Sequence, residues 1–260
     1  MIELRHVTKR FGAVTSVDDV SLTVARGELL VLLGGSGSGK TTCLKMINRL
    51  IEPTSGEVTI GGRDIRGMAP HLLRRSIGYC FQRIGLFPHM TVGQNVGITL
   101  SLLGWEAGRI RARVAELLEL VELPAAQYRT RMPDQLSGGQ QQRVGVARAL
   151  AAQPDVVLFD EPFGALDPLT RDRLQDSLSQ IRRQVQMTAV FVTHDMVEAL
   201  LLADRIAVMQ SGKLLQVGTP QELVKSPADD YVEQLIQTPS RQSEQVRALF
   251  KRVLGPDWQP

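Results

Sequence analysis

An uninterrupted apolar run that leads into a glycine-rich turn constrains the fold of this chain more than any other feature. The run is Leu29–Leu33, and because it carries no polar residue it predicts a central strand buried on both faces. The turn spans residues 34–41, and the apolar residues of the following stretch, 41–50, fall on one side of a predicted helix. A strand, a glycine loop and a helix in this order indicate an α/β fold.

The turn matches the pattern G-x-x-x-x-G-K-[ST] of phosphate-binding loops. Its residues are Gly34, Gly35, Ser36, Gly37, Ser38, Gly39, Lys40 and Thr41, and Thr42 comes next. Glycines let the backbone bend closely around a phosphate chain, and the start of the helix adds the positive end of its dipole. The Lys40 ammonium can reach the terminal phosphates, and the Thr41 hydroxyl can coordinate Mg²⁺. We therefore expect this loop to hold ATP and Mg²⁺.

Two further apolar runs, 156–159 and 189–192, each end in polar residues. The first is followed by Asp160 and Glu161, and the second by a turn that contains His194. Ligands of open α/β sheets bind beyond the carboxyl ends of the strands, so these side chains are expected to converge on the glycine loop. Adjacent residues point in different directions, which lets Asp160 serve Mg²⁺ while Glu161 acts as a general base toward water.

Composition and charge narrow the class of protein. The net charge is only +3, and Lys and Arg are spread along the chain rather than gathered in a stripe, which argues against a nucleic-acid partner. Cys43 and Cys80 both stand in apolar sequence, which predicts buried free thiols in a reducing compartment. We expect neither a signal peptide nor a membrane span, because the apolar runs are far shorter than about 20 residues.

A second anion-binding pattern lies in Leu136-Ser137-Gly138-Gly139-Gln140, just before a predicted helix. A chain that already has one phosphate loop does not need another for the same nucleotide. The second surface therefore suggests a composite site that is closed by a second copy.

With this segment the chain resembles the ATP-binding cassette (ABC) ATPases over about residues 1–237. The motifs occur in the order of the family: Lys40 in the Walker A loop, Gln82 in the Q-loop, residues 136–140 as the signature, Asp160 and Glu161 at the end of Walker B, Ala165-Leu166-Asp167 as the D-loop, and His194 as the switch histidine. The resemblance implies a P-loop NTPase fold with a mixed, largely parallel core sheet, an N-terminal antiparallel β subdomain and a helical signature subdomain at about 92–140. Residues 238–260 would form a short tail, predicted as one amphipathic helix.

The resemblance also implies a role for each matching residue. Phe11 would stack on adenine, unless it is an ordinary aromatic of the core at a strand end. Gln82 would touch Mg²⁺ and the attacking water, and His194 would contact the γ-phosphate. Ser137, Gly139 and Gln140 would approach the nucleotide held by the opposite subunit. Asp167 would cross the dimer interface, unless it only starts a helix. Gly35 departs from the family, in which many members carry proline.

Within the family, the chain looks most like the importers of glycine betaine, choline, carnitine and related osmoprotectants. This likeness rests on Arg75-Ser76-Ile77-Gly78-Tyr79 and on the pair Ile84-Gly85 that precedes Leu86-Phe87-Pro88-His89-Met90-Thr91. Some relatives in that subfamily carry C-terminal CBS modules, and the segment after Ile236 is too short for one.

The resemblance implies a homodimer, or paired cassettes, bound peripherally to permease subunits at the cytoplasmic face of the cell membrane, with an extracytoplasmic solute-binding protein as an indirect partner. Three alternatives remain open: import of another organic ion such as a polyamine or a sulfonate, an exporter, and a soluble cassette protein of translation or DNA repair.

Overall fold

The computed structural model of the protein describes residues 1–82, 85–164, 166–185 and 187–254. Arg83, Ile84 and Ala165, which carry part of the family resemblance, lie outside the described residues. The strands are β1 (Ile2–Phe11), β2 (Val14–Val24), β3 (Leu29–Leu33), β4 (Ser55–Ile60), β5 (Arg63–Asp64), β6 (Ile77–Cys80), β7 (Val156–Asp160), β8 (Thr188–Thr193), β9 (Arg205–Gln210) and β10 (Lys213–Gly218).

The helices follow the same chain order. They are α1 (Lys40–Ile47), the 3₁₀ turn η1 (Ile65–Gly67), α2 (Pro70–Ser76), α3 (Val92–Leu102), α4 (Ala107–Leu120), α5 (Ala125–Tyr128), the 3₁₀ turn η2 (Pro133–Gln135), α6 (Gly138–Leu150), α7 (Pro168–Val185), α8 (Met196–Leu202), α9 (Pro220–Lys225) and α10 (Asp230–Leu254).

The central sheet has six strands in the order β10-β9-β3-β8-β7-β6. β3 runs parallel to β9 and β8, and the parallel pairing continues through β7 to β6, whereas β10 is antiparallel to β9. Every residue of β3 and β7 is buried, which agrees with the uninterrupted apolar runs. In the register, Leu33 pairs with Thr193 and Asp160 pairs with Val192. The predicted polar strand ends therefore meet at one edge of the sheet.

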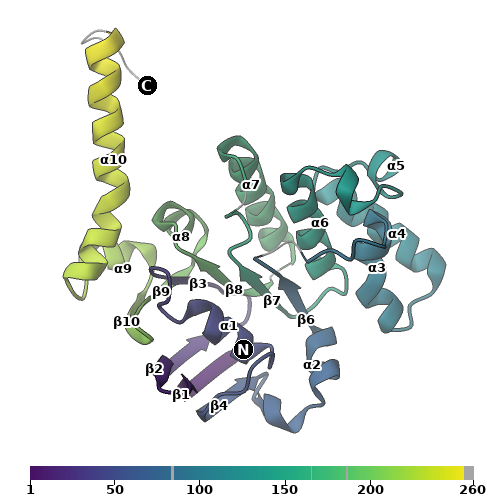
Figure 1. The fold of residues 1–260 in the computed structure, drawn as a ribbon, viewed down its shortest axis with the longest axis horizontal. Coiled ribbons are helices and arrows are strands. Elements are labelled where there is room, and N and C mark those ends of the chain that lie inside the picture. The colour runs from purple at the N-terminus through teal and green to yellow at the C-terminus, as the bar shows by residue number, and fades with distance from the viewer. Residues whose placement is uncertain (83–84, 165, 186, 255–260) are drawn as a thin grey trace.

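A second sheet, in the order β2-β1-β4-β5, is antiparallel throughout. Together the two sheets confirm the predicted mixed core with an N-terminal antiparallel part. Helices α3, α4, α5 and α6 gather beside the central sheet, on the right of Figure 1, and α10 extends away from the body at the opposite side. Helix α10 begins at Asp230, earlier than the tail boundary at residue 238 that the sequence suggested.

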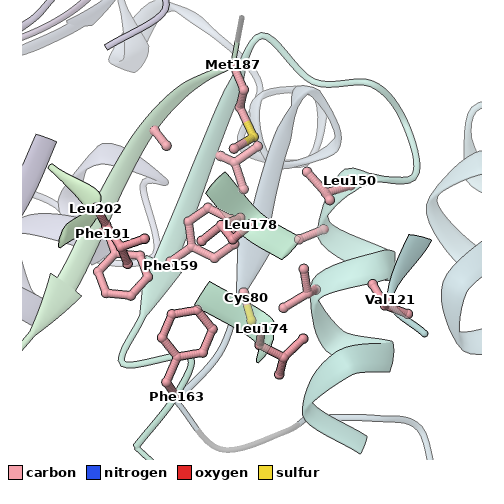
Figure 2. Close-up of a cluster of buried hydrophobic side chains, with 14 of the residues drawn as sticks. Cys80, Val121, Leu150, Phe159, Phe163, Leu174, Leu178, Met187, Phe191 and Leu202 are labelled. Carbon is pink, nitrogen blue, oxygen red and sulfur yellow. The ribbon is translucent and has the colours of Figure 1, made fainter. Parts of the chain in front are cut away.

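The core consists of two apolar clusters, and the central sheet divides them. Leu29, Val31 and Leu33 belong to one cluster and Leu30 and Leu32 to the other, because alternate residues of a strand point to opposite faces. In the first cluster the ring of Phe191 lies 5.8 Å from that of Phe159 and 5.5 Å from that of Phe163 (Figure 2). Phe159 directly precedes Asp160, and Phe191 lies two residues before Thr193, so both strand ends that carry polar residues are anchored in the core by a buried ring.

Strand β6 was not predicted from the sequence. Its four residues include Gly78, which interrupts the apolar pattern. A Cβ atom at Gly78 would lie 2.2 Å from the Ala149 carbonyl oxygen, so the glycine lets helix α6 approach the strand closely. The strand leads directly to Gln82 and adds the Tyr79 side chain to the polar edge of the sheet.

Candidate functional site

The loop between β3 and α1 has a conformation that only glycine permits at two points. Gly34 has φ 155°, and a Cβ atom there would lie 2.1 Å from the Met209 carbonyl oxygen. Gly39 has φ 100°, and a Cβ atom there would lie 2.5 Å from the Ser16 carbonyl oxygen. The loop is therefore pressed against β2 and β9 on its inner side. This packing gives the tight cradle that a phosphate chain requires.

Lys40 is buried within this cradle. Its ammonium donates to the carbonyl oxygens of Gly34 and Gly35, each at 2.8 Å, and to the Ser38 hydroxyl at 3.2 Å. Burial lowers the pKa of Lys40, while the nearby carboxylates of Glu161 and Asp160 act in the opposite direction. To contact a phosphate, the Lys40 ammonium must give up at least one of these three hydrogen bonds. Breaking that bond reduces the net free energy gained when the phosphate binds.

Thr41 and Asp160 meet across the sheet edge. The Thr41 hydroxyl donates to Oδ1 of Asp160 at 2.8 Å, and the Tyr79 hydroxyl donates to Oδ2 at 3.3 Å. Burial raises the pKa of Asp160, and the hydrogen bond from Thr41 opposes the shift. A hydroxyl and a carboxylate so close together are oxygen ligands of the kind Mg²⁺ prefers, so the donor set fits this ion. Thr42 points elsewhere, and its hydroxyl lies 2.9 Å from that of Ser16.

Glu161 receives two polar partners from different elements. Its Oε2 atom lies 3.2 Å from Nδ1 of His194, and Nε2 of Gln82 donates to the same oxygen at 3.3 Å. The backbone of Glu161 has φ 46°, a left-handed conformation that is costly for a residue with a side chain. Its N–H donates to the Val192 carbonyl at 3.0 Å, which holds the conformation. The structure thus brings Gln82, Glu161 and His194 together at one point of the sheet edge.

The carboxyl group of Glu198 fixes the turn that carries His194. No motif in the sequence predicted a role for Glu198. The Thr193 hydroxyl donates to Oε2 of Glu198 at 2.6 Å, and the Asp195 N–H donates to the Thr193 hydroxyl at 3.0 Å. From helix α7, Nε of Arg171 lies 3.8 Å from Oε1 of Glu198. Glu198 is buried, and this burial raises its pKa. The available signal was a single acidic residue within the otherwise apolar helix α8.

The sequence profile of the ABC transporter family matches residues 17–164, more than half of the chain. The chain belongs to the ABC transporter family.

Individual ABC proteins match over most of the chain. It is 51% identical over 237 residues to the glycine betaine/carnitine/choline transport ATP-binding protein OpuCA of Bacillus subtilis (strain 168), a match that covers 91% of this chain and 62% of that protein. It is 51% identical over 234 residues to the glycine betaine uptake system ATP-binding protein YehX of Escherichia coli (strain K12), covering 90% and 76%. The chain therefore spans less than two thirds of OpuCA.

Among solved structures, the ATP-binding cassette MJ0796, described as a dimeric post-hydrolysis state bound to ADP and Pi, superposes with a TM-score of 0.78. The sequence identity is 35%, and the match covers 85% of this chain and 99% of that one. Our chain thus shares the fold of this ABC cassette.

The residues of the predicted ABC signature contact helices α5 and α7. Ser137 accepts the N–H of Gln140 at the start of α6, and Nε2 of Gln140 donates to the Tyr128 hydroxyl at 3.3 Å. At Gly139 a Cβ atom would lie 3.2 Å from Cγ2 of Thr170 in α7. Among the described residues, Ser137, Gly139 and Gln140 form no hydrogen bond or ion pair with residues 34–42. Ser137 is exposed and open to a partner.

Two other predicted site residues are also at the surface. Phe11 is 50% exposed, with the Lys9 ammonium 5.0 Å from its ring centre, so it is not an aromatic of the core. Asp167 is exposed, and hydrogen bonds from the side chain of Thr170 and from its backbone N–H, the latter at 3.0 Å, lower the pKa of the Asp167 carboxyl group. These hydrogen bonds lie at the start of helix α7, so Asp167 has the helix-starting role that the sequence left open. A role of Asp167 at a dimer interface stays a prediction.

Asn95 is a further residue that the sequence analysis missed. Its fully buried amide accepts the Phe87 N–H at 2.8 Å and donates to the carbonyls of Phe87, Met90 and Thr91 at 3.0–3.1 Å. This single side chain therefore fixes the loop 87–91 that follows the Q-loop. No helix in the described part of this cassette is long and apolar enough to span a membrane.

Proposed function

We propose that this chain is the ATP-hydrolysing subunit of an ABC importer that works as a dimer beneath a membrane permease. The observation that carries the proposal is the position of Glu161, held by Gln82 and His194 beside the pair Thr41–Asp160 and the Lys40 loop. A carboxylate, two polar groups for orienting water, and a phosphate cradle form the set that phosphoryl transfer to water requires.

In the proposed reaction, ATP lies with its β- and γ-phosphates in the loop 34–41. Glu161 accepts a proton from a water molecule as the water oxygen attacks the γ-phosphorus, and the bond to the β–γ bridging oxygen breaks to release ADP. Lys40 and the backbone N–H groups of the loop stabilise the charge that develops, which is the largest expected contribution to the rate. His194 and Gln82 keep the carboxylate and the water aligned.

Thr41, Asp160 and Gln82 are the residues that would hold Mg²⁺. When bound, the ion supplies Lewis-acid polarisation of the phosphate oxygens. The 2.8 Å hydrogen bond between Thr41 and Asp160 keeps both oxygen ligands at the end of the loop, where the triphosphate would lie.

The separation of the signature from the phosphate loop supports a dimer with composite sites. Ser137 and Gly139 at the start of α6 would complete the site of the opposite subunit, because a helix N-terminus attracts anions. The likeness to a cassette described as dimeric supports the same assembly. Phe11 would stack on adenine from its exposed position, and Asp167 would face the partner subunit.

A groove next to the Q-loop supports the docking of a permease. It has a volume of about 410 Å³ and is lined by the exposed side chains of Phe81, Phe87 and Leu102 together with Arg74 and Arg75. Because Asn95 holds the loop 87–91 rigidly, a helix of the permease would meet a preformed apolar surface. This arrangement would place the chain on the cytoplasmic face of the membrane, as a peripheral subunit.

The proposed solute is glycine betaine or another quaternary ammonium osmoprotectant. Support comes from the names of relatives about 50% identical, which include a choline transport ATP-binding protein of Bacillus subtilis (strain 168). The cassette itself does not touch the solute, so this part of the proposal rests on likeness to importers rather than on a side chain. A solute-binding protein outside the membrane would deliver the solute to the permease.

Uptake of labelled glycine betaine at high osmolarity, in cells with and without the gene, tests the proposal. Deletion should abolish uptake, and the wild-type gene but not Lys40→Ala should restore it. Excess unlabelled choline should compete, and spermidine should not. Unchanged uptake in a strain with no other betaine system would refute the solute assignment, whereas absence of ATP hydrolysis by the purified complex with its permease would refute the proposed activity.

A further inference from the structure

The first turn of the C-terminal helix α10 contacts the phosphate loop. The backbone N–H of Gly35 donates to the hydroxyl oxygen of Tyr231 at 3.1 Å, although the two residues are 196 positions apart in the chain. Figure 1 shows α10 leaving the body beyond α9, so its base is the part that can reach the loop. Tyr231 lies outside the phosphate loop, the Q-loop, the signature, the Walker B strand, the D-loop and the switch histidine.

The contact acts on a peptide group that also binds Lys40. The N–H of Gly35 and the carbonyl of Gly34 belong to the same planar peptide unit. While Tyr231 accepts the N–H, the carbonyl oxygen accepts the Lys40 ammonium at 2.8 Å. The peptide is therefore held from both sides. Without the hydroxyl this peptide would be held only through its carbonyl, so its orientation, and with it one of the three bonds that position the Lys40 ammonium, would be less restricted.

Tyr231 is itself held firmly. The adjacent Val232 is fully buried, and its N–H donates to Oδ1 of Asp229 at 2.9 Å. Leu235 and Ile236, one turn further along α10, pack against the first apolar cluster, the one that contains Phe159 and Phe191. The hydroxyl is thus presented by a rigid base and not by a freely moving side chain.

Steric fit does not require glycine at position 35. A Cβ atom there would lie 3.7 Å from the Tyr231 hydroxyl, an ordinary contact, and Gly35 is not among the residues with positive φ. A proline at the same position would remove the donor. What the contact does require is the backbone N–H of residue 35.

We propose that Tyr231 is a positioning residue for the phosphate loop, through which the C-terminal helix sets the affinity of the cassette for ATP. The inference rests on the proposed function, because it assumes that the loop binds the phosphates of ATP. The hydroxyl fixes the 34–35 peptide, the peptide orients Lys40, and Lys40 contacts the nucleotide. Hydrolysis itself depends on Glu161, which Tyr231 does not touch.

Tyr231→Phe removes only the hydroxyl and is the first test. Because the hydroxyl would act by pre-organising the loop, loss of one neutral hydrogen bond should weaken the affinity by up to about fivefold. In the full-length chain with Mg²⁺, the Kd for the fluorescent analogue mant-ATP and the KM for ATP should both rise by about this factor, while kcat at saturating ATP stays within about twofold. Thr238→Val is the matched control, because it removes a hydroxyl from the same helix, and among the described residues this hydroxyl bonds to the Gln234 carbonyl alone.

A double-mutant cycle identifies the atom through which Tyr231 acts. In a Gly35→Pro background the donor is gone, so adding Tyr231→Phe should cause no further loss of affinity. In a Gly35→Ala background the N–H is retained, and adding Tyr231→Phe should again weaken binding about fivefold. If Gly35→Pro does not fold, the alanine background and the split between KM and kcat still decide the question.

The outcomes separate the two proposals. If wild type binds mant-ATP and Tyr231→Phe binds equally well, the inference is overturned and the proposed function is unaffected. Equal losses in the proline and alanine backgrounds would also overturn it, because the hydroxyl would then act through another group. Wild type that binds no nucleotide under conditions where it is folded would overturn both.

Discussion

Nδ1 of His194 lies 3.2 Å from Oε2 of Glu161, and this contact joins the ends of two neighbouring strands, β7 and β8. A carboxylate only accepts, so the contact is favourable when Nδ1 carries a proton. Gln82 donates to the same oxygen, so Glu161 is held from two sides even though its own backbone is in an unfavourable conformation. A costly conformation that is kept by several contacts is typical of functional sites.

Replacing Glu161 with glutamine should stop turnover but not nucleotide binding. The amide keeps the shape of the side chain and cannot accept the proton of water, so kcat should fall by about 100-fold or more. Size-exclusion chromatography with ATP and Mg²⁺ should find the variant as a stable dimer, and a phosphate-release assay gives the rate. Rapid hydrolysis by this variant would remove Glu161 from the role of base.

Replacing Thr41 with valine should weaken the response to Mg²⁺. The change removes the hydroxyl that bonds Asp160 at 2.8 Å and leaves a side chain of similar size. We expect the Mg²⁺ concentration for half-maximal mant-ATP binding to rise by about tenfold or more. Thr41→Ser keeps the hydroxyl and should retain most of the Mg²⁺ affinity. If Thr41→Val and Thr41→Ser require the same Mg²⁺ concentration for half-maximal mant-ATP binding, Thr41 is not an Mg²⁺ ligand.

The pH dependence of stability should identify Glu198 as a buried carboxyl. Burial raises its pKa above the ordinary value of 4.5, so the folded protein holds a proton that the unfolded chain has lost. The free energy of unfolding therefore falls as pH rises from 4.5 through the raised pKa. Glutamine has no proton to lose in this pH range, so the fall in the free energy of unfolding should be absent in Glu198→Gln. In urea denaturation at several pH values, the free energy of unfolding of the variant should rise relative to that of wild type as pH increases.

Glu222→Gln is a control with the opposite sign. The backbone hydrogen bond from Thr219 lowers the pKa of Glu222, so its contribution to stability is present above pH 4.5 and is lost as pH falls through the lowered pKa. The loss of stability that Glu222→Gln causes, measured as the free energy of unfolding, should therefore become smaller as the pH falls. Parallel pH profiles for the two variants would contradict both assignments.

The two cysteines should be unreactive in the native protein. Cys43 and Cys80 are buried, and burial raises the pKa of each thiol to about 12, which leaves almost no thiolate at neutral pH. A thiol reagent that absorbs on reaction should detect no free thiol until denaturant is added and two thiols thereafter. Fast labelling of the folded protein would indicate that the core around α1, which carries Cys43, or around β6, which carries Cys80, opens readily.

Much of the site follows from local sequence patterns. A strand buried on both faces needs an unbroken apolar run, and a loop in the conformation of Gly34 and Gly39 needs glycine, so β3 and the phosphate loop are both recognisable from adjacent residues. Asp160 and Glu161 were recognisable for the same reason, since polar residues directly after such a run lie at the ligand-binding edge of a parallel sheet.

Other features depend on the order of the strands, which no local pattern states. β3 lies between β8 and β9, and this order brings Met209 against Gly34 and Thr193 beside Leu33. The short strand β6 was missed because Gly78 breaks its pattern, although the close approach of α6 requires that glycine.

Local patterns in the amino-acid sequence are enough to predict which chemical groups this cassette carries and at which strand ends they stand, because glycine conformation and strand burial are local properties. The distant side chains that hold those groups in place are identified by the packing of the folded chain alone. Glu198 fixes the turn of His194, and Tyr231 reaches Gly35 from the other end of the chain. Such contacts arise because packing joins segments far apart in the sequence, and a single hydrogen bond leaves no periodic trace in either segment.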